Sequence, residues 1–136
     1  MLNGKRILIT GIATEDSIAT ATARAALEAG ARVALTAFPR DLDAARAIAD
    51  DLDPQILVRA LDLCDPETTD EIGRAVAAEL GGLDGALHAV AFAPAAALSG
   101  DFLAADAAAT ELAFRTSAWS LTNLARTFRE IGRAHV

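Results

Sequence analysis

The chain has 136 residues, of which 53% are hydrophobic and 23% are charged, and its formal net charge is −7. This composition is typical of one packed domain, and the negative charge argues against nucleic acid or an anionic membrane surface as a partner. No apolar run is long enough to span a bilayer, the N-terminus lacks the apolar core of a signal peptide, and the single cysteine, Cys64, excludes an internal disulfide. We therefore expect a cytoplasmic domain without a membrane partner.

Short apolar runs alternate along the chain with segments of helical periodicity. Each run has the length and the β-branched content of a strand buried on both faces of a sheet. The expected strands are Arg6–Thr10, Arg32–Thr36, Ile56–Ala60 and Gly85–Phe92.

The segments after these strands carry helix start and stop signals. Asp16 or Ser17 can cap a first helix that stops at Gly30, and Asp65-Pro66-Glu67 is a strong start for a later helix. A second helix is expected over Asp41–Leu52, a loop over Pro94–Leu103, and a long helix over Asp106–Arg129 with Leu112, Thr116, Trp119 and Leu124 near its inner face.

Strand alternating with helix through four strands predicts right-handed βαβ units and a parallel sheet. The favoured fold is a Rossmann-type, doubly wound α/β sheet with strand order 3-2-1-4, and only the N-terminal part of such a sheet. Its ligand lies across the carboxyl ends of the strands, where strands 1 and 4 diverge. The residues that directly follow each strand are therefore the candidate binding residues.

The turn after the first strand has one glycine, not the three of G-x-G-x-x-G. Gly11 permits a sharp turn and a close backbone approach beside Ile12. Ser17 and the N–H of Ile18 lie at a helix N-terminus, where free amides and the helix dipole attract a pyrophosphate. An ordinary strand-to-helix turn capped by Ser17 would explain the same residues, so the turn alone leaves both interpretations open.

The next two strand ends carry an aromatic residue and an acid. Phe38 stands where an NAD site usually has an acid; it could stack on adenine or simply cover the sheet edge. Arg40 could attract a 2′-phosphate or be a solvated loop charge. Asp62 could accept a hydrogen bond from the adenine amino group, with Leu63 against the ring, or could be a turn residue.

Small residues follow the fourth strand. Val90 and Ala91 leave room for ribose and nicotinamide, and Phe92 is expected on the substrate side. We interpret His88, inside the strand, as a packed residue, and Trp119 as a core or interface residue.

The chain carries four distinctive segments in order: L-N-G-K-R-I-L-I-T-G-I-A-T-E-D-S-I-A (2–19), A-L-T-A-F-P-R (34–40), L-D-L (61–63) and L-D-G-A-L-H-A-V-A-F-A-P (83–94). This set resembles the bacterial enoyl-acyl-carrier-protein reductases, divergent members of the short-chain dehydrogenase/reductase family. The G-x5-S-I-A loop is the discriminating feature, because ordinary members carry three glycines there. Phe38 with Arg40 is most similar to the actinobacterial branch, which uses NADH.

The resemblance implies transfer of hydride from NADH to C3 of a trans-2-enoyl thioester on acyl carrier protein, in fatty-acid elongation, by a homotetrameric parent enzyme. It implies a substrate-side role for Phe92 and no metal ligand. The cofactor-binding residues that it implies are Gly11, Ile12, Ser17, Ile18, Phe38, Asp62, Leu63, Val90 and Ala91.

The family's catalytic tyrosine, and the lysine seven residues after it, lie beyond the last expected helix. This chain has no tyrosine, and Lys5 is its only lysine. We therefore name no catalytic residue and expect residues 1–129 to be an incomplete NAD-binding Rossmann domain that is inactive by itself. Two alternatives stay open: another short-chain dehydrogenase/reductase, and a non-enzymatic nucleotide-binding module.

The resemblance fades at about Arg129, and residues 130–136 read E-I-G-R-A-H-V. One frame of a common sequencing adapter translates to the same seven letters. Our hypothesis is that this tail does not belong to the family and is an artefact. The alternative is a natural helix end with Gly132 after the last turn.

Overall fold

A parallel four-stranded sheet forms the centre of the molecule in the computed structural model, which describes residues 1–98 and 101–134. The strands lie in the order β3-β2-β1-β4, and each neighbouring pair is parallel. The predicted fold class and strand order are therefore confirmed. The strands are β1 (Arg6–Thr10), β2 (Arg32–Ala37), β3 (Leu57–Ala60) and β4 (Gly85–His88).

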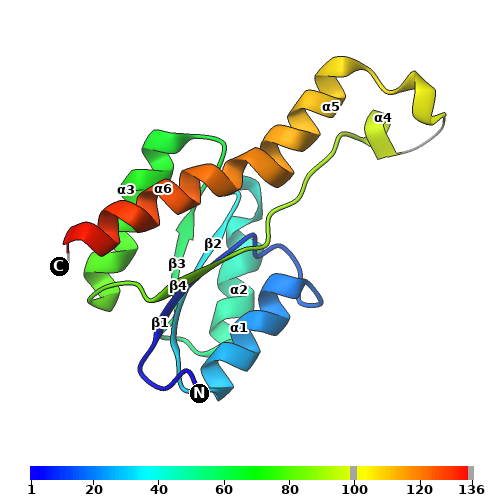
Figure 1. The fold of residues 1–136 in the computed structure, drawn as a ribbon. Helices are drawn as coiled ribbons and strands as arrows, with labels where there is room; N and C mark the ends of the chain where they lie inside the picture. Colours follow the sequence, from blue (N-terminus) through cyan, green and yellow to red (C-terminus); the bar gives the residue numbers. More distant parts are fainter. Residues whose placement is uncertain (99–100, 135–136) are drawn as a thin grey trace.

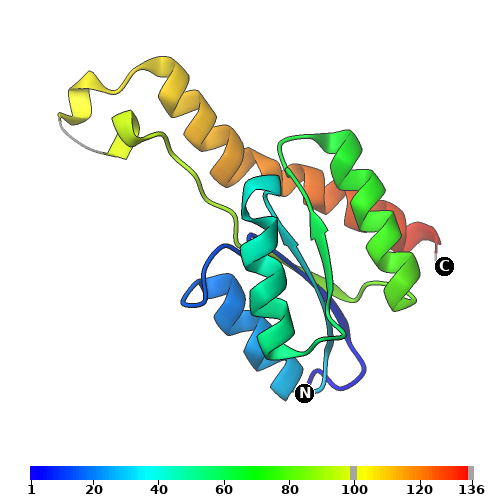
Figure 2. The same ribbon diagram turned by 180° about the vertical axis from the view of Figure 1, so that it is seen from behind.

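Helices cover both faces of the sheet. Helices α1 and α2 lie on one face, and α3 and α6 lie side by side on the other (Figure 1, Figure 2). The segment that holds α4 and α5 projects away from the sheet (Figure 1). The helices are α1 (Ile18–Glu28), α2 (Leu42–Leu52), α3 (Pro66–Leu80), α4 (Ala95–Leu98), α5 (Ala107–Phe114) and α6 (Ser120–Ala134).

Alternation along the strands divides the core into two apolar layers, because successive side chains of a strand point to opposite faces. Ile9 packs with the alanine-rich faces of α1 and α2, whereas its neighbour Leu8 packs with Val76 of α3 and Leu124 of α6. The alanines of α1 let that helix lie close to the sheet. None of the helices in the described ranges is both long and apolar enough to cross a membrane.

Two predicted helix starts are confirmed by their caps. The Ser17 Oγ accepts a hydrogen bond of 3.2 Å from the N–H of Thr20. The Asp65 carboxylate accepts from the N–H groups of Glu67, at 3.0 Å, and Thr68, at 3.4 Å. The Thr68 hydroxyl, together with these amides, outweighs burial and holds the pKa of Asp65 below its ordinary value.

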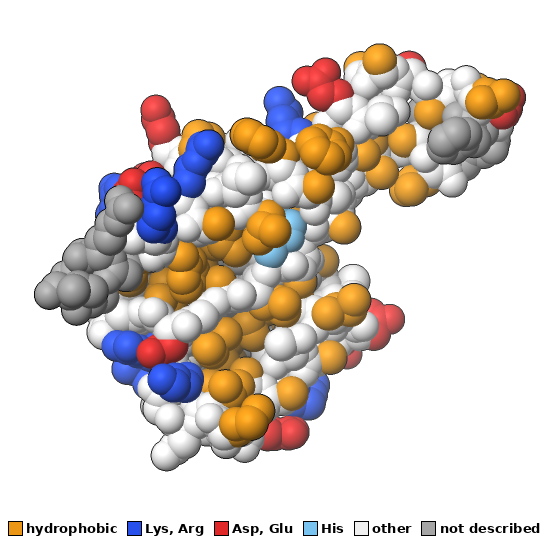
Figure 3. Space-filling view, viewed as in Figure 1, with side chains coloured by type: hydrophobic (Ala, Val, Ile, Leu, Met, Phe, Trp, Pro, Cys, Tyr) orange, Lys and Arg blue, Asp and Glu red, His pale blue; other side chains and the backbone are white. Residues whose placement is uncertain are grey.

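The fourth strand is shorter than the sequence predicted, since β4 ends at His88 instead of Phe92. Its partner β1 ends opposite it at Thr10, and the chain then turns at Gly11. Among the described residues no strand lies on the other side of β4, so residues 89–92 have no ladder to join. Apolar side chains gather between α1 and α6, where β4 forms the sheet edge (Figure 3).

The long C-terminal helix is interrupted. A π-helical turn over Arg115–Trp119 separates α5 from α6, and α4 lies within the expected loop. The wider turn shifts the helical phase, so Thr116 and Leu124 are buried as expected while Trp119 is 48% exposed. The expectation that Trp119 lies on the inner face was therefore wrong. Phe114 and Leu121 are exposed on the same stretch of helix.

Helix α6 continues past Arg129, where the sequence predicted its end. Glu130 pairs with Arg74 of α3 at 3.0 Å, and Ile131 is buried. The predicted helix end was therefore wrong. The hypothesis on the origin of residues 130–136 stays a prediction, and residues 135–136 lie outside the described part of the chain.

Candidate functional site

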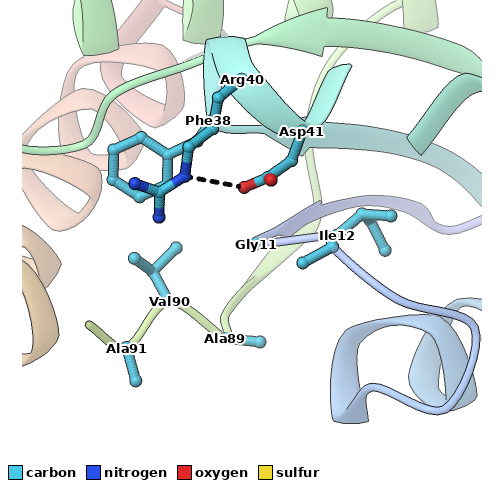
Figure 4. A pocket seen from close by; sticks show the side chains of 9 residues that line it. Gly11, Ile12, Phe38, Arg40, Asp41, Ala89, Val90 and Ala91 are labelled. Atoms are coloured by element: carbon cyan, nitrogen blue, oxygen red, sulfur yellow. Dashed lines mark ion pairs between the residues drawn. The ribbon is translucent and has the colours of Figure 1, made fainter. Parts of the chain in front are cut away.

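A pocket lies at the carboxyl ends of β1, β2 and β4 (Figure 4). It is open to solvent, and the space between its walls, solvent included, is about 370 Å³. Three short segments of the chain meet around it. Its lining consists of Gly11, Ile12, Ala13, Phe38, Arg40, Asp41, Ala89, Val90 and Ala91.

The pocket brings together five of the residues that the sequence singled out as cofactor-binding. They come from the turn after β1, the end of β2 and the segment after β4. These five are Gly11, Ile12, Phe38, Val90 and Ala91.

Gly11 makes the close approach of two of these segments possible. Its φ is +86°, a conformation that favours glycine. A Cβ at this position would overlap the carbonyl oxygen of Ala89 and lie 2.7 Å from its carbonyl carbon. The turn after β1 is thus packed directly on the backbone that leaves β4.

The amides of this turn are already engaged inside the protein. Gly11 and Ile12 both donate their N–H groups to the carbonyl oxygen of Thr36, at 3.0 and 3.1 Å. These two residues therefore contribute shape to the pocket. Free donors are expected at the start of α1 instead, because the first N–H groups of a helix have no partner within it.

Ser17 and Ile18 lie at that helix start, outside the pocket lining. The Ser17 hydroxyl lies 3.0 Å from the hydroxyl of Thr20 as well as capping its N–H. Ile18 is 77% exposed. Both residues stand at the N-terminal end of α1, where the helix dipole is positive.

An arginine closes one side of the pocket. The Arg40 guanidinium carbon lies 5.3 Å from the ring centre of Phe38 and 5.3 Å from that of Phe92, within cation–π range. Its Nε also pairs with a carboxylate oxygen of Asp41 at 3.5 Å. Figure 4 shows the guanidinium in front of the Phe38 ring and over Val90.

Asp41 lines the pocket but was not among the predicted site residues. An acid is expected directly after β2, where Phe38 stands, and Asp41 lies at the beginning of the predicted second helix. The signal that could have found it is the P-R-D sequence itself, because Pro39–Asp41 forms a tight helical turn that brings the third residue back to the strand end.

The backbone of Phe92 is held by the π-helical turn. The Phe92 N–H donates to the Ser117 Oγ at 3.0 Å, and the Ser117 hydroxyl donates to the Phe92 carbonyl oxygen at 3.1 Å. One hydroxyl thus satisfies both backbone groups of a residue that has left the sheet. Phe92 is positioned beside Arg40, at the edge of the pocket.

His88 is packed between β4 and α6. Its Nε2 lies 2.8 Å from the Ser120 Oγ, and Ser120 in turn donates to the carbonyl oxygen of Thr116. Burial lowers the pKa of His88, so the imidazole is neutral at pH 7.

Asp62 and Leu63 lie beyond β3 and do not line the pocket. The Asp62 Oδ1 accepts a hydrogen bond of 2.9 Å from the N–H of Cys64, which makes it a turn residue. Leu63 is 1% exposed and packs in the core, and its carbonyl oxygen accepts from Asn123. Their roles toward adenine stay predictions. No cluster suited to a metal ion occurs within the described ranges.

A parallel 3-2-1-4 sheet with a pocket at its switch point defines a Rossmann-type α/β protein. The family model described as enoyl-(acyl carrier protein) reductase matches residues 11–135. The chain therefore belongs to this family.

Individual relatives agree with this assignment. The chain is 43% identical to enoyl-acyl-carrier-protein reductase (NADH) FabI of Neisseria meningitidis, over 97% of this chain and 51% of that protein. It is 40% identical to the enoyl-acyl-carrier-protein reductase (NADH) of Mycolicibacterium smegmatis, over 69% of this chain and 36% of that protein.

Solved structures match the fold over nearly the whole chain. The Bacillus cereus enoyl-acyl carrier protein reductase with NADP+ and indole naphthyridinone has a TM-score of 0.88 and 32% identity, over 96% of this chain and 51% of that chain. The enzyme from Anaplasma phagocytophilum in complex with NAD has a TM-score of 0.84 and 29% identity, over 96% and 50%. The chain spans about half the length of these relatives.

Proposed function

We propose that this chain is the cofactor-binding part of an NADH-dependent enoyl-acyl-carrier-protein reductase. The observation that carries the proposal is the pocket at the switch point of the sheet, where Gly11, Phe38 and Val90 meet. Family membership and relatives named as NADH reductases support the same activity. The parent enzyme would reduce a trans-2-enoyl thioester on acyl carrier protein and act as a homotetramer.

The residues present fit a dinucleotide. Gly11 and Ala91 keep the pocket floor free of bulk, and the Phe38 ring offers a flat surface to adenine. The capped N-terminus of α1 would attract the pyrophosphate through its free amides and dipole, near Ser17. Bound NADH would supply the hydride, and the part played by this chain is to bind and orient the cofactor.

The chain by itself is proposed to bind and not to reduce. It holds no tyrosine to donate a hydrogen bond to the enolate oxygen, and its one lysine, Lys5, precedes β1. Loss of one such donor costs an acyl-transfer enzyme roughly 3–4 kcal/mol of barrier, and a misplaced cofactor adds to that cost.

Titration of the 136-residue chain with NADH, followed by calorimetry, tests binding, and an enoyl thioester assay tests turnover. Saturable binding, weakened by Phe38→Ala, without reduction of the thioester is the expected result. Absence of NADH binding would overturn the proposal. Turnover above a no-protein control would contradict the expectation that the chain by itself is inactive. If the parent enzyme reduced ketones in place of enoyl thioesters, it would belong with other short-chain dehydrogenases.

A further inference from the structure

The acid that is missing directly after β2 is present three residues later in sequence and inside the pocket. Pro39–Asp41 forms a single helical turn in which the N–H of Asp41 donates to the carbonyl oxygen of Phe38 at 2.9 Å. This turn folds the chain back, so that Asp41 lines the same pocket as Gly11 and Ala13.

Asp41 stands directly before α2, but its side chain makes no capping hydrogen bond with that helix. Its carboxylate instead points toward the neighbouring Arg40, with which it pairs at 3.5 Å (Figure 4). With 32% of the side chain exposed, the carboxylate is open to a ligand that enters the pocket.

The Arg40 guanidinium group has three neighbours, although 63% of its side chain is exposed. Phe38 and Phe92 each contact its guanidinium group at 5.3 Å from the ring centres, and Asp41 pairs with its Nε. The Asp41 charge compensates the Arg40 charge at close range, so the pocket does not present an uncompensated cation to an incoming phosphate.

We infer that Asp41 selects the dinucleotide without a 2′-phosphate. In this fold the adenosine half lies beside the first turn and the end of the second strand, which is where Asp41 stands. A carboxylate accepts charge-assisted hydrogen bonds from ribose hydroxyls. A 2′-phosphate would instead bring about −1.5 to −2 charges against it. The inference rests on the proposed function, because it requires the adenosine ribose to occupy this pocket.

Arg40 contributes to the same selection between the two dinucleotides. Removal of the Asp41 charge frees the guanidinium group, which can then pair with a 2′-phosphate. The acid thus acts both directly, through its own charge, and indirectly, by holding Arg40.

The test measures dissociation constants of NADH and NADPH by calorimetry on the 136-residue chain. The variants are Asp41→Asn, Arg40→Gln and the double variant. Asp43→Asn is the matched control, because this carboxylate lies two residues further along, is 99% exposed and does not line the pocket. Thermal unfolding of each variant verifies that the fold is retained.

Wild type should bind NADH more tightly than NADPH. Asp41→Asn should weaken the binding of NADH, tighten the binding of NADPH and change the ratio of their dissociation constants by about tenfold or more. This change should be smaller at high salt. Adding Arg40→Gln should cancel the gain for NADPH, and Asp43→Asn should leave the ratio unchanged.

An unchanged ratio in Asp41→Asn, in a chain that binds NADH, would overturn the inference and leave the proposed function intact. An undiminished gain for NADPH in the double variant would overturn the part assigned to Arg40. Failure of the wild-type chain to bind either dinucleotide would overturn the proposed function itself.

Discussion

Substitution of Gly11 by alanine tests how closely the turn after β1 is packed on the end of β4. The positive φ of +86° costs an L-residue roughly 1–2 kcal/mol. The new methyl group would also overlap the Ala89 carbonyl group, and overpacking of this kind costs about 1–3 kcal/mol. We expect Gly11→Ala to lower the free energy of unfolding by about 2–5 kcal/mol, a large part of the stability of a small domain.

Gly4→Ala is the matched control for this substitution. Gly4 also has a positive φ, +70°, but a Cβ there would meet nothing within 4 Å. Only the backbone cost of roughly 1–2 kcal/mol should remain. Urea unfolding of the three proteins can be followed through Trp119, the only tryptophan in a chain without tyrosine. Equal losses in the two variants would show that the turn does not press on the β4 segment.

Gly73→Ala should lower the free energy of unfolding by about 1–3 kcal/mol, because a Cβ there would overlap the Thr127 methyl group between α3 and α6; unchanged urea unfolding would contradict this. Arg6 donates hydrogen bonds to Asp84 and lowers its pKa, so this stabilisation is present above the unfolded pKa of about 3.9 and is lost as pH falls further. The Tm of Asp84→Asn should therefore fall less steeply with decreasing pH than the Tm of the wild type, whereas parallel curves of Tm against pH would contradict this expectation. The chain should associate at micromolar concentration through the exposed surface around Trp119, with a blue shift of its emission, and a monodisperse monomer in sedimentation would disprove that.

Features that depend on nearby residues could be predicted from the sequence. The Ser17 cap and the Asp65 cap each bond to N–H groups within three residues, and both were identified from their residue types. Strand order followed from the regular alternation of strands and helices. The positions of Gly11 and Val90 in one pocket then followed from the rule that the carboxyl ends of parallel strands meet at one edge.

Features that depend on distant partners could not be predicted in this way. Phe92 looks like a strand residue, but strand β1 ends too early to pair with it. Its backbone is bonded by Ser117, 25 residues away. Nothing in an apolar pattern with a period of 3.6 reveals the extra residue of the π-helical turn. Asp41 was missed because Pro39 begins a turn that changes which residue faces the pocket.

The hydroxyl of Ser117 sets a lower limit on the piece of chain that a protein engineer could transplant as a binding module. The last strand, β4, ends at His88, and the last residue of the pocket lining is Ala91. Cutting the chain soon after Ala91 would therefore keep all four strands and every lining residue. It would nevertheless remove the only described side chain that bonds both backbone groups of Phe92. A graft that is meant to keep the pocket wall in place must therefore carry α5, the π-helical turn and enough of α6 to anchor that turn against the sheet.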